Sequence, residues 1–558
     1  MQLRLAWSFV APLALVVACG PSEHGARDAG SAVDVDAGTA GTVDAGTVDA
    51  GTVDAGTVDA GTVDAGTVDA GTVDAGTVDA GPGPHIVVGA ADRVLLEGTV
   101  VTPTITFEGA VLVEGDTITC AAAGDECAAR TGAGGATVVA TDGIIAPGLI
   151  DTHNHILFDV FDEHHWTPAT VYQDHTQWVN ETRYKEMLDV KQCLANDSQG
   201  KPAWCAQTPY GTSSGSLRCE MDKFGELKGL IAGTTSIVGL PGTSGPCFGS
   251  LARSVDDAQN GLGADTIRTS AVFPPSRSTA DSVCNELGSS VGAYLIHCGE
   301  GTDAKALAEL TSLSSVSSTP GCLLAPQTTI THAVAFAATD FDALAQHGVN
   351  ITWSPASNLF LYGATTDIPS ALDSGIVIAL GPDWSLGGSQ NMLDEMRAAD
   401  AYDNANWGDR LSPQDLVTMA TKNGAHVLGL DHRLGQLQEG MLADIAVYHG
   451  DRSDPFASIV RATPADTELV MVGGTVLYGD VALGAAGPSA PGCETLDVCG
   501  SNKFLCAATA SSSPSDKLGQ SYADIRQALE TAFTDVDAAR PDDGFVYSPP
   551  TPLVRCGP

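Results

Sequence analysis

Hydrophobic and polar positions divide the chain into regions of different periodicity. Short apolar runs separated by turn residues occupy 86–90, 93–96, 105–107, 110–113 and 117–119, and the same texture returns at 444–448, 468–472 and 475–478. Runs of this kind are typical of short β-strands. Because the two groups flank a long central region, we expect a small composite β-sandwich domain assembled from residues 85–146 and 436–487.

Residues 147–435 show a second pattern, in which apolar, β-branched runs alternate with helical periodicity. The candidate strands are 144–150, 233–238, a poorly defined run near 250–255, 266–273, 293–297, 328–332, 349–353 and 376–381. A helix is expected over 411–430, where Ser412 and Pro413 supply a cap and a first-turn proline. Such alternation is the signature of parallel βαβ units, so we predict an α/β fold with a (β/α)8 TIM barrel.

The pattern changes again at residues 488–558. This segment is rich in Ser and Pro, has one amphipathic stretch near 521–537, and carries four cysteines, Cys493, Cys499, Cys506 and Cys556. We expect a C-terminal extension tied by disulfides, and no motif in it indicates chemistry.

The N-terminus has the features of an export signal. Arg4 precedes an apolar run over 5–18 that is too short for a comfortable membrane span, and the run ends in Val-Val-Ala-Cys-Gly at 16–20. This resembles a bacterial lipobox, which predicts a lipoprotein signal peptide at 1–19 and a lipid on Cys19. An ordinary cleaved signal peptide with a chance cysteine is the alternative.

A repeat follows the signal. Residues 41–80 are eight uninterrupted copies of Gly-Thr-Val-Asp-Ala. A repeat period of five residues matches neither the period of a helix face nor that of a strand. One valine per copy cannot bury enough surface to offset the loss of chain entropy on folding. We therefore interpret residues 20–84 as a disordered acidic tether, with a calcium-binding repeat as the alternative.

Net charge and cysteine content limit the partners and the cellular compartment that we expect for this protein. The formal net charge of −42 would repel phosphate backbones and excludes nucleic acid as a partner. The 14 cysteines include no CxxC pair, which favours an oxidising compartment, and Cys120 and Cys127 form the easiest local bridge. Together with the lipobox, this predicts an exported lipoprotein of the bacterial outer membrane, periplasm or cell surface. The sequence does not indicate an oligomeric state.

Polar residues of one kind end the predicted barrel strands, where catalytic groups of such barrels gather. His153 and His155, which point the same way on extended backbone, follow the first strand. His297 ends the fifth, His332 ends the sixth and Asp383 follows the eighth. A lone histidine at a strand end is more often structural. The combination predicts one divalent metal ion, zinc first, with iron or manganese as alternatives.

These segments resemble the motifs of the amidohydrolase superfamily. The similar segments, which lie within about residues 86–480, are PGLIDTHNH at 147–155, LIHCGEG at 295–301, THAVAF at 331–336, the long run from SPASNLF at 354–360 to DEMR at 394–397, and NGAHVLGLDHRLGQLQEGMLADIAVY at 423–448. Their order is similar to that of the mononuclear-metal branch, which includes deaminases, chlorohydrolases and imidazolonepropionase-like enzymes.

The resemblance implies a role for each site residue. His153, His155, His297 and Asp383 would bind one metal ion and a water. Asp383 would also accept a proton from this water, His332 would hold the water or polarise the substrate, and Glu300 would carry a proton to the leaving nitrogen. A glutamate on a surface loop is the alternative interpretation of Glu300. The family usually has GTD where this chain has GPD, and Pro382 removes a backbone donor there.

We therefore predict an enzyme, a metal-dependent hydrolase of non-peptide carbon–nitrogen bonds that deaminates a ring or opens a cyclic amide of a small-molecule substrate. An imidazolone- or dipeptide-hydrolysing relative and an inactive surface binding lipoprotein on the same fold are the alternatives. The long first βα loop, about 156–223, is expected to shape substrate entry. Its His164 and His165 give a weaker indication of a second metal ion.

Overall fold

The computed structural model describes residues 84–197, 200–239, 251–256, 262, 266–271, 273–488, 493–508, 519–541 and 544–557. The predicted signal peptide, Cys19 and the tether lie outside these residues, apart from Pro84. Within these ranges no helix combines the length and the apolar character that a membrane span requires.

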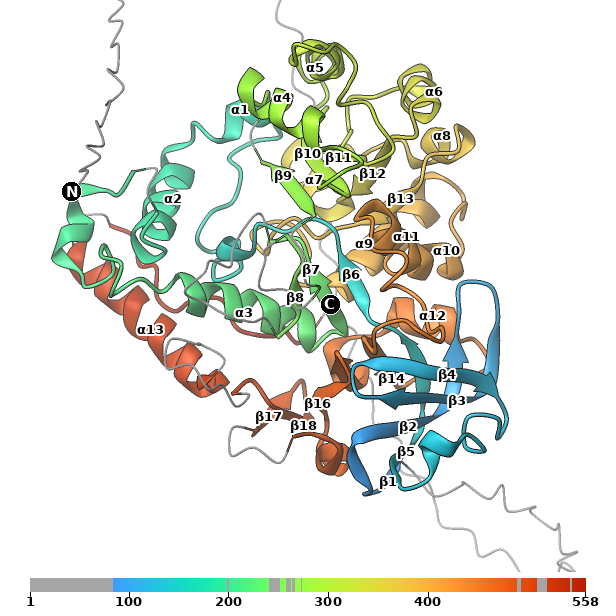
Figure 1. The fold of residues 1–558 in the computed structure, drawn as a ribbon. Coiled ribbons are helices and arrows are strands. Elements are labelled where there is room, and N and C mark those ends of the chain that lie inside the picture. Colours follow the sequence, from blue (N-terminus) through green and yellow to red (C-terminus); the bar gives the residue numbers. More distant parts are fainter. Residues whose placement is uncertain are drawn as a thin grey trace, which may run out of the picture. The chain divides into compact units, whose positions relative to one another are not determined.

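A ten-stranded sheet takes strands from both sides of the central region (Figure 1). Its first group is β1 (His85–Val87), β2 (Ala90–Val101), β3 (Thr106–Glu114), β4 (Thr117–Ala123) and β5 (Ala136–Pro147). Its second group is β14 (Ile445–Tyr448), β15 (Thr467–Val472), β16 (Thr475–Asp480), β17 (Glu494–Val498) and β18 (Ser501–Leu505). The order is β17-β18-β16-β15-β14-β5-β2-β3-β4, with β1 also on β5. The antiparallel β5–β14 pair joins the groups, and two strands of the C-terminal extension lengthen the sheet.

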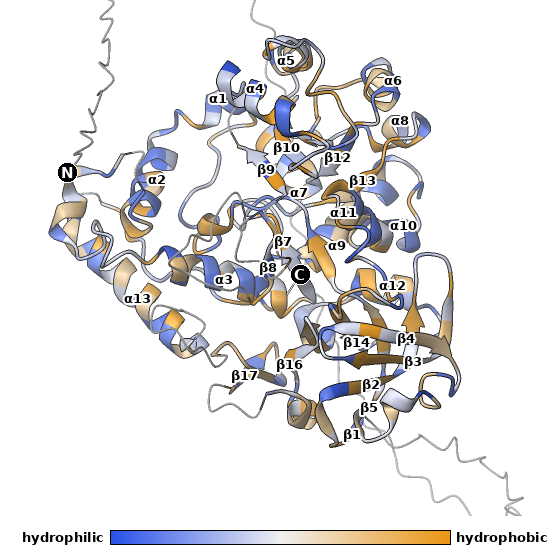
Figure 2. Ribbon diagram, in the orientation of Figure 1, coloured by the Kyte–Doolittle hydropathy of each residue, from blue (hydrophilic) through white to orange (hydrophobic). Residues whose placement is uncertain are grey.

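The sheet buries side chains on both faces. Leu95 and Leu112 pack in one cluster with Cys120, whereas their neighbours Leu96 and Val111 belong to a different, larger cluster. Successive side chains of a strand point to opposite faces, so a continuous apolar run serves two cores. Figure 2 shows these hydrophobic stretches along β2 and β3. The predicted bridge between Cys120 and Cys127 is confirmed.

Eight parallel strands of the described chain form two further sheets. One has the order β6-β7-β8, with β6 (Leu149–Asp151), β7 (Thr234–Ile237) and β8 (Arg253–Ser254). The other has the order β13-β12-β11-β10-β9, with β9 (Ile267–Ser270), β10 (Ala293–Cys298), β11 (Thr328–His332), β12 (Asn350–Trp353) and β13 (Ile378–Leu380). A parallel bridge between Asn154 and Asp383 connects the ends of β6 and β13. The predicted α/β class is confirmed.

Helices connect and cover these strands. They are α1 (His175–Trp178), α2 (Thr182–Leu194), α3 (Arg218–Leu230), α4 (Arg277–Glu286), α5 (Ala304–Ser315), α6 (Ala338–Gln346), α7 (Pro355–Tyr362), α8 (Ile368–Asp373), α9 (Met392–Asn406), α10 (Pro413–Met419), α11 (Lys422–Val427), α12 (Pro455–Arg461) and α13 (Tyr522–Ala539).

Two of the predicted elements are each divided in two. The helix expected over 411–430 is wrong as one element, because the carbonyl of Ala420 accepts from the backbone N–H of Ile150 and so leaves the helical ladder between α10 and α11. Ser412 caps α10 as predicted. The run 144–150 is also two strands, since β5 ends at Pro147 and the N–H of Gly148 turns to the carbonyl of Asp444.

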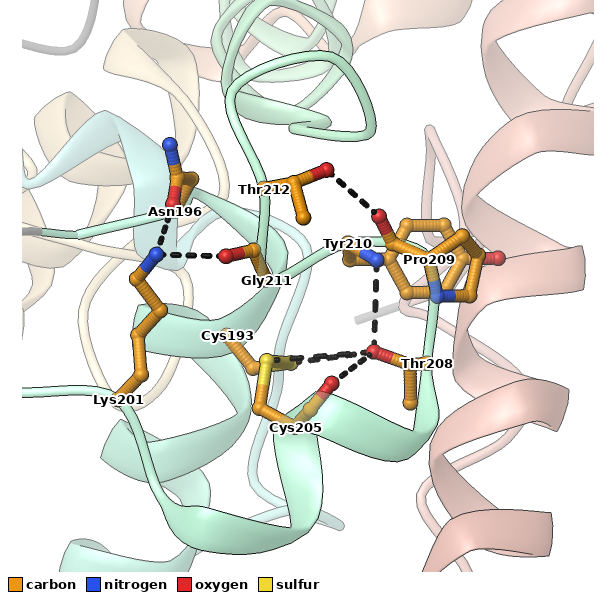
Figure 3. Close-up of a disulfide and its surroundings, with 9 residues drawn as sticks. All are labelled: Cys193, Asn196, Lys201, Cys205, Thr208, Pro209, Tyr210, Gly211 and Thr212. Atoms are coloured by element: carbon orange, nitrogen blue, oxygen red, sulfur yellow. Dashed lines mark hydrogen bonds between the residues drawn. A yellow bond between two sulfur atoms is a disulfide. The ribbon is translucent and has the colours of Figure 1, made fainter.

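The long first βα loop, which we call the insert (residues 156–223, described except for 198–199), is held by its own disulfide and by the C-terminal extension. Cys193 and Cys205 bridge within it, and Lys201 donates to the carbonyl of Gly211 nearby (Figure 3). In the extension, α13 packs beside α3 (Figure 1). The disulfides Cys493–Cys506 and Cys499–Cys556 tie the extension to itself.

Candidate metal centre

The four predicted metal ligands converge at the carboxyl ends of β6, β10 and β13. The potential ligand atoms of His153, His155, His297 and Asp383 lie within 4.8 Å of one another. Asp383 Oδ1 lies 3.0 Å from His153 Nε2 and 3.4 Å from His155 Nε2. The Nε2 atoms of His155 and His297 are 3.3 Å apart. The structure therefore brings together all four residues.

Backbone contacts between the strand ends fix this geometry. The N–H of Asp383 donates to the carbonyl of His153 at 2.9 Å, and the N–H of His155 donates to the carbonyl of Asp383 at 2.5 Å. A Cβ on Gly381 would lie 2.7 Å from the backbone nitrogen of His153, so only glycine permits this approach. Although Pro382 has no backbone N–H, the N–H of Asp383 makes the contact with His153, so the proline does not displace Asp383. Asp383 itself has a φ of 73°, a left-handed conformation that aspartate tolerates better than most residues.

The protonation of the histidines suits metal binding. Burial lowers the pKa of His155 to about 3, and burial also holds the pKa of His153 and of His297 well below the usual range. Each imidazole is therefore neutral near pH 7 and has a lone pair for an ion. Three neutral imidazoles and one carboxylate fit the donor set of Zn²⁺.

The two other predicted catalytic residues, Glu300 and His332, lie beside this cluster. Glu300 is only 5% exposed, so its interpretation as a surface glutamate is wrong. Its Oε1 accepts from the hydroxyl of Tyr362 at 2.6 Å, and that hydroxyl accepts from the indole nitrogen of Trp178 at 2.9 Å. His332 Nδ1 lies 2.9 Å from Asn358 Oδ1, and its Nε2 lies 3.9 Å from Glu300 Oε1. The Asn358 contact directs the Nδ1–H away from the site and leaves Nε2 beside Glu300.

A cavity of about 400 Å³ opens onto these groups. One part of its lining, which we call the metal side, consists of His155, His297, Glu300, His332 and Asp383. Most of the rest, which we call the aromatic side, consists of Phe158, Trp178, Tyr184, Phe273 and Trp384. The Trp178 ring lies 5.4 Å from that of Trp384 and 4.9 Å from that of Tyr184, measured between centroids. A flat, apolar molecule fits such walls.

Two histidines of the insert, His164 and His165, contact the C-terminal extension. His165 Nε2 lies 2.8 Å from the carbonyl oxygen of Tyr547, and His164 Nε2 lies 3.3 Å from that of Val546. Both contacts go to the C-terminal extension. Within the described ranges neither histidine belongs to a cluster of potential metal ligands.

Sequence reasoning missed the residues of α7 that hold the site. Ser357 donates to Asp383 Oδ2 at 2.5 Å. The next residue, Asn358, contacts His332 Nδ1, and Tyr362, four residues after Asn358, donates to Glu300 Oε1. The segment SPASNLFLY resembles the family, and its polar positions on a mostly apolar helix are the signal that could have marked these residues. Cys298, beside His297, is buried and is the one free cysteine among the described residues.

Comparisons with known proteins agree with this site. The profile of the amidohydrolase family matches residues 292–477. A 5′-deoxyadenosine deaminase of Methanothermobacter thermautotrophicus is 30% identical over 168 residues, which are 28% of this chain and 39% of the relative. A 5-methylthioadenosine/S-adenosylhomocysteine deaminase of Thermococcus onnurineus is 34% identical over 161 residues, 27% of this chain and 38% of the relative. The chain thus spans about two fifths of the length of either deaminase.

Solved structures extend the likeness of the fold. The structure of the zinc complex of atrazine chlorohydrolase from Arthrobacter aurescens TC1 superposes with a TM-score of 0.53 and 19% identity, covering 71% of this chain and 96% of that chain. A triazine hydrolase variant superposes with a TM-score of 0.52 and 20% identity, with the same coverage. These structures support the fold. The resemblance to the amidohydrolase superfamily is confirmed by the family profile, which matches residues 292–477, the segment that carries His297, Glu300, His332 and Asp383.

Proposed function

We propose that this protein is a metal-dependent hydrolase of non-peptide carbon–nitrogen bonds. The observation that carries the proposal is that His155, His297 and Asp383, three of the four clustered metal ligands, line one cavity with Glu300, His332 and several aromatic residues. The family match and the deaminase relatives support it. The relatives give no support to an imidazolone- or dipeptide-hydrolysing enzyme or to an inactive binding protein.

His153, His155, His297 and Asp383 would hold one divalent ion, with zinc as the first candidate. Bound there, the ion would supply a Lewis acid that brings the pKa of a water ligand towards neutrality. Asp383 Oδ1 accepts a proton from the attacking water while Ser357 holds Oδ2. His332 Nε2 orients the water or the substrate. Glu300, fixed through Oε1 by Tyr362, passes a proton to the nitrogen that leaves as the carbon–nitrogen bond breaks.

The substrate we propose first is an aminopurine nucleoside. A flat heterocycle suits the tryptophan and tyrosine walls, and the names of the two deaminase relatives point to substrates of this class. The reaction would exchange the exocyclic amino group for oxygen and release ammonia.

We further propose two features that frame this activity. The parallel strands β6–β8 and β9–β13 would close into one (β/α)8 barrel, with a β-sandwich beside it, a proposal that the Asn154–Asp383 bridge supports at one of the two seams of the barrel. The protein would be exported and anchored through Cys19, which the disulfides of the described chain support because such bridges persist in oxidising compartments. Cys19→Ala should then move the enzyme from the membrane fraction to the soluble fraction without changing its turnover number.

The test of the activity combines metal analysis with a screen for ammonia release. The purified full chain should contain about one divalent ion per chain and should release ammonia from an aminopurine nucleoside, another heterocyclic amine or a cyclic amide. A protein that is loaded with zinc and releases no ammonia from any member of this panel would contradict the proposal.

A further inference from the structure

The insert meets the segment that carries Glu300 through backbone hydrogen bonds. The N–H of Thr302 donates to the carbonyl of Gln173 at 2.7 Å, and the N–H of His175 donates to the carbonyl of Glu300 at 3.2 Å. Asp174 and Gly301 form an antiparallel bridge between these two bonds. His175 is thereby held beside the proton-transfer residue, although it comes from a loop far away in the sequence.

A buried carboxylate fixes the His175 ring. His175 Nε2 lies 2.8 Å from Oε1 of Glu309, which is 7% exposed, and Oε2 of Glu309 accepts from the N–H of Gly299 at 2.8 Å. Burial acts to lower the pKa of His175, but the bond to Glu309 and the charges of Glu300, Glu309 and Asp174 outweigh it, so the pKa is raised. A protonated ring bound through Nε2 presents an N–H donor at Nδ1.

His175 belongs to the wall of the cavity beside the metal ligands. His175 lines the cavity together with the aromatic residues, and no residue of the described chain bonds its Nδ1. The neighbouring polar groups are already engaged, because the hydroxyl of Thr176 donates to Asp174 at 2.5 Å and the indole nitrogen of Trp178 donates to Tyr362. Apart from the metal ligands, Glu300 and His332, Tyr184 supplies a further polar side-chain group on this wall.

We propose that His175 is a specificity-determining residue, whose Nδ1 donates a hydrogen bond to an oxygen of the substrate outside the heterocycle that reacts. In a nucleoside this acceptor is a sugar oxygen. The inference rests on the proposed function for the chemistry at the metal. It adds that His175, held by Glu309, lets the enzyme distinguish a nucleoside from its free base.

Two substitutions of His175 distinguish the contribution of its Nδ1 from that of its Nε2. In His175→Gln the amide nitrogen lies near the position of Nε2 and can still bind Glu309, while the donor at Nδ1 is lost. In His175→Asn the amide nitrogen lies near the position of Nδ1, while the bond to Glu309 is lost. Tyr184→Phe is the matched control, because it removes a further polar group of the wall and keeps the ring.

The experiment measures binding of 5′-deoxyadenosine and of adenine by calorimetry, with zinc-loaded full chain in which Glu300→Gln slows turnover. His175→Gln should weaken 5′-deoxyadenosine binding by about 10-fold or more, since a hydrogen bond from a charged donor is lost, and should change adenine binding by less than about 2-fold. His175→Asn should restore most of the affinity for 5′-deoxyadenosine. Tyr184→Phe should leave the ratio of the two affinities unchanged.

Three results would overturn the inference while leaving the proposed function standing. They are equal weakening of both probes by His175→Gln, a loss of discrimination on Tyr184→Phe instead, and a starting protein that binds adenine but not the nucleoside. Failure of the proposed function is seen separately, as zinc-loaded wild-type protein that releases no ammonia. The thermal midpoint of each variant shows whether it is folded, and the two His175 substitutions provide independent readings.

Discussion

The two sides of the cavity are built in different ways. The metal side is fixed by the strands themselves, because β6 and β13 exchange backbone hydrogen bonds at His153, His155 and Asp383. Three residues of the aromatic side, Phe158, Trp178 and Tyr184, lie on the insert, which contacts the C-terminal extension. Arg183 of the insert stacks on Phe545, with its guanidinium carbon 3.1 Å from the ring centroid.

Further contacts join the same two segments. The N–H of Thr551 donates to the carbonyl of Val160 at 3.0 Å, and Arg555 forms an ion pair with Glu163 at 2.6 Å. The proposed reaction and the proposed selection of the substrate therefore have separate structural supports. Changes at the strand ends should abolish the chemistry, whereas changes in the extension should alter substrate binding first.

The largest effect is expected at Asp383. Asp383→Ala removes a metal ligand and the acceptor for the water proton, so activity should fall by several orders of magnitude and the divalent ion should be lost. Ammonia release and metal content per chain measure this. The control is Asp373→Ala, an exposed carboxylate that pairs with Arg410 and should change neither quantity. Normal turnover of Asp383→Ala would contradict the role of Asp383 as a metal ligand and proton acceptor.

Glu300→Gln should have the next largest effect. The amide can keep the bond with Tyr362 but cannot exchange protons, so the turnover number should fall by about 10²- to 10⁴-fold, the usual contribution of general acid–base catalysis. Metal content and KM should stay near the wild-type values, because Glu300 acts mainly in the transition state. A variant without its metal ion would instead make Glu300 a ligand.

The aromatic side can be weakened from a distance through the extension. Cys499→Ser with Cys556→Ser opens a bridge that spans 57 residues, which should lower the free energy of unfolding by about 2–4 kcal/mol. We expect KM to rise more than the turnover number falls, because the insert loosens while the metal ligands remain in place. Chemical denaturation and steady-state kinetics measure the two effects.

The matched control removes a different bridge, Cys120–Cys127 of the ten-stranded sheet. Cys120→Ser with Cys127→Ser should also lower stability but should leave KM unchanged. If both pairs of substitutions change KM equally, the extension has no special connection with the cavity.

The smallest effect is expected from the repeat. Deleting residues 41–80 should leave the melting temperature and the turnover number nearly unchanged, because one valine per copy is too little apolar surface to contribute to a core. Calorimetry and kinetics of the shortened chain measure this. A large loss of stability would mean that the repeat packs on one of the two sides.

The residues at the strand ends could be predicted from the sequence, whereas those placed by tertiary contacts could not. His297 and His332 were predicted because a strand with a polar last residue is a local pattern, and parallel strands place their ends together. Tyr362 and His175 reach the site through tertiary contacts, which leave no periodic signal. The single helix expected over 411–430 failed for the same reason, since a hydrogen bond from Ile150, far away in the chain, interrupts it.

The C-terminal extension was the least readable part. The runs ETLDV and SNKFL became β17 and β18 of the ten-stranded sheet, but only pairing with β16 distinguishes them from loop segments of similar composition. Cysteine spacing predicted disulfides in this region, whereas the partners, such as Cys499 with Cys556, depend on the folded path of the chain.

The pairing of β5 with β14 has a consequence for the order in which the chain folds. Ile144, Ile145 and Ala146 are fully buried against Ile445–Tyr448, so a nascent chain carries an open, apolar strand edge until ribosomes have made β14. Such edges are templates for intermolecular pairing. Fragments that stop before residue 445 contain every predicted metal ligand, yet we expect them to aggregate, and their loss should be rescued by supplying the missing strands in trans.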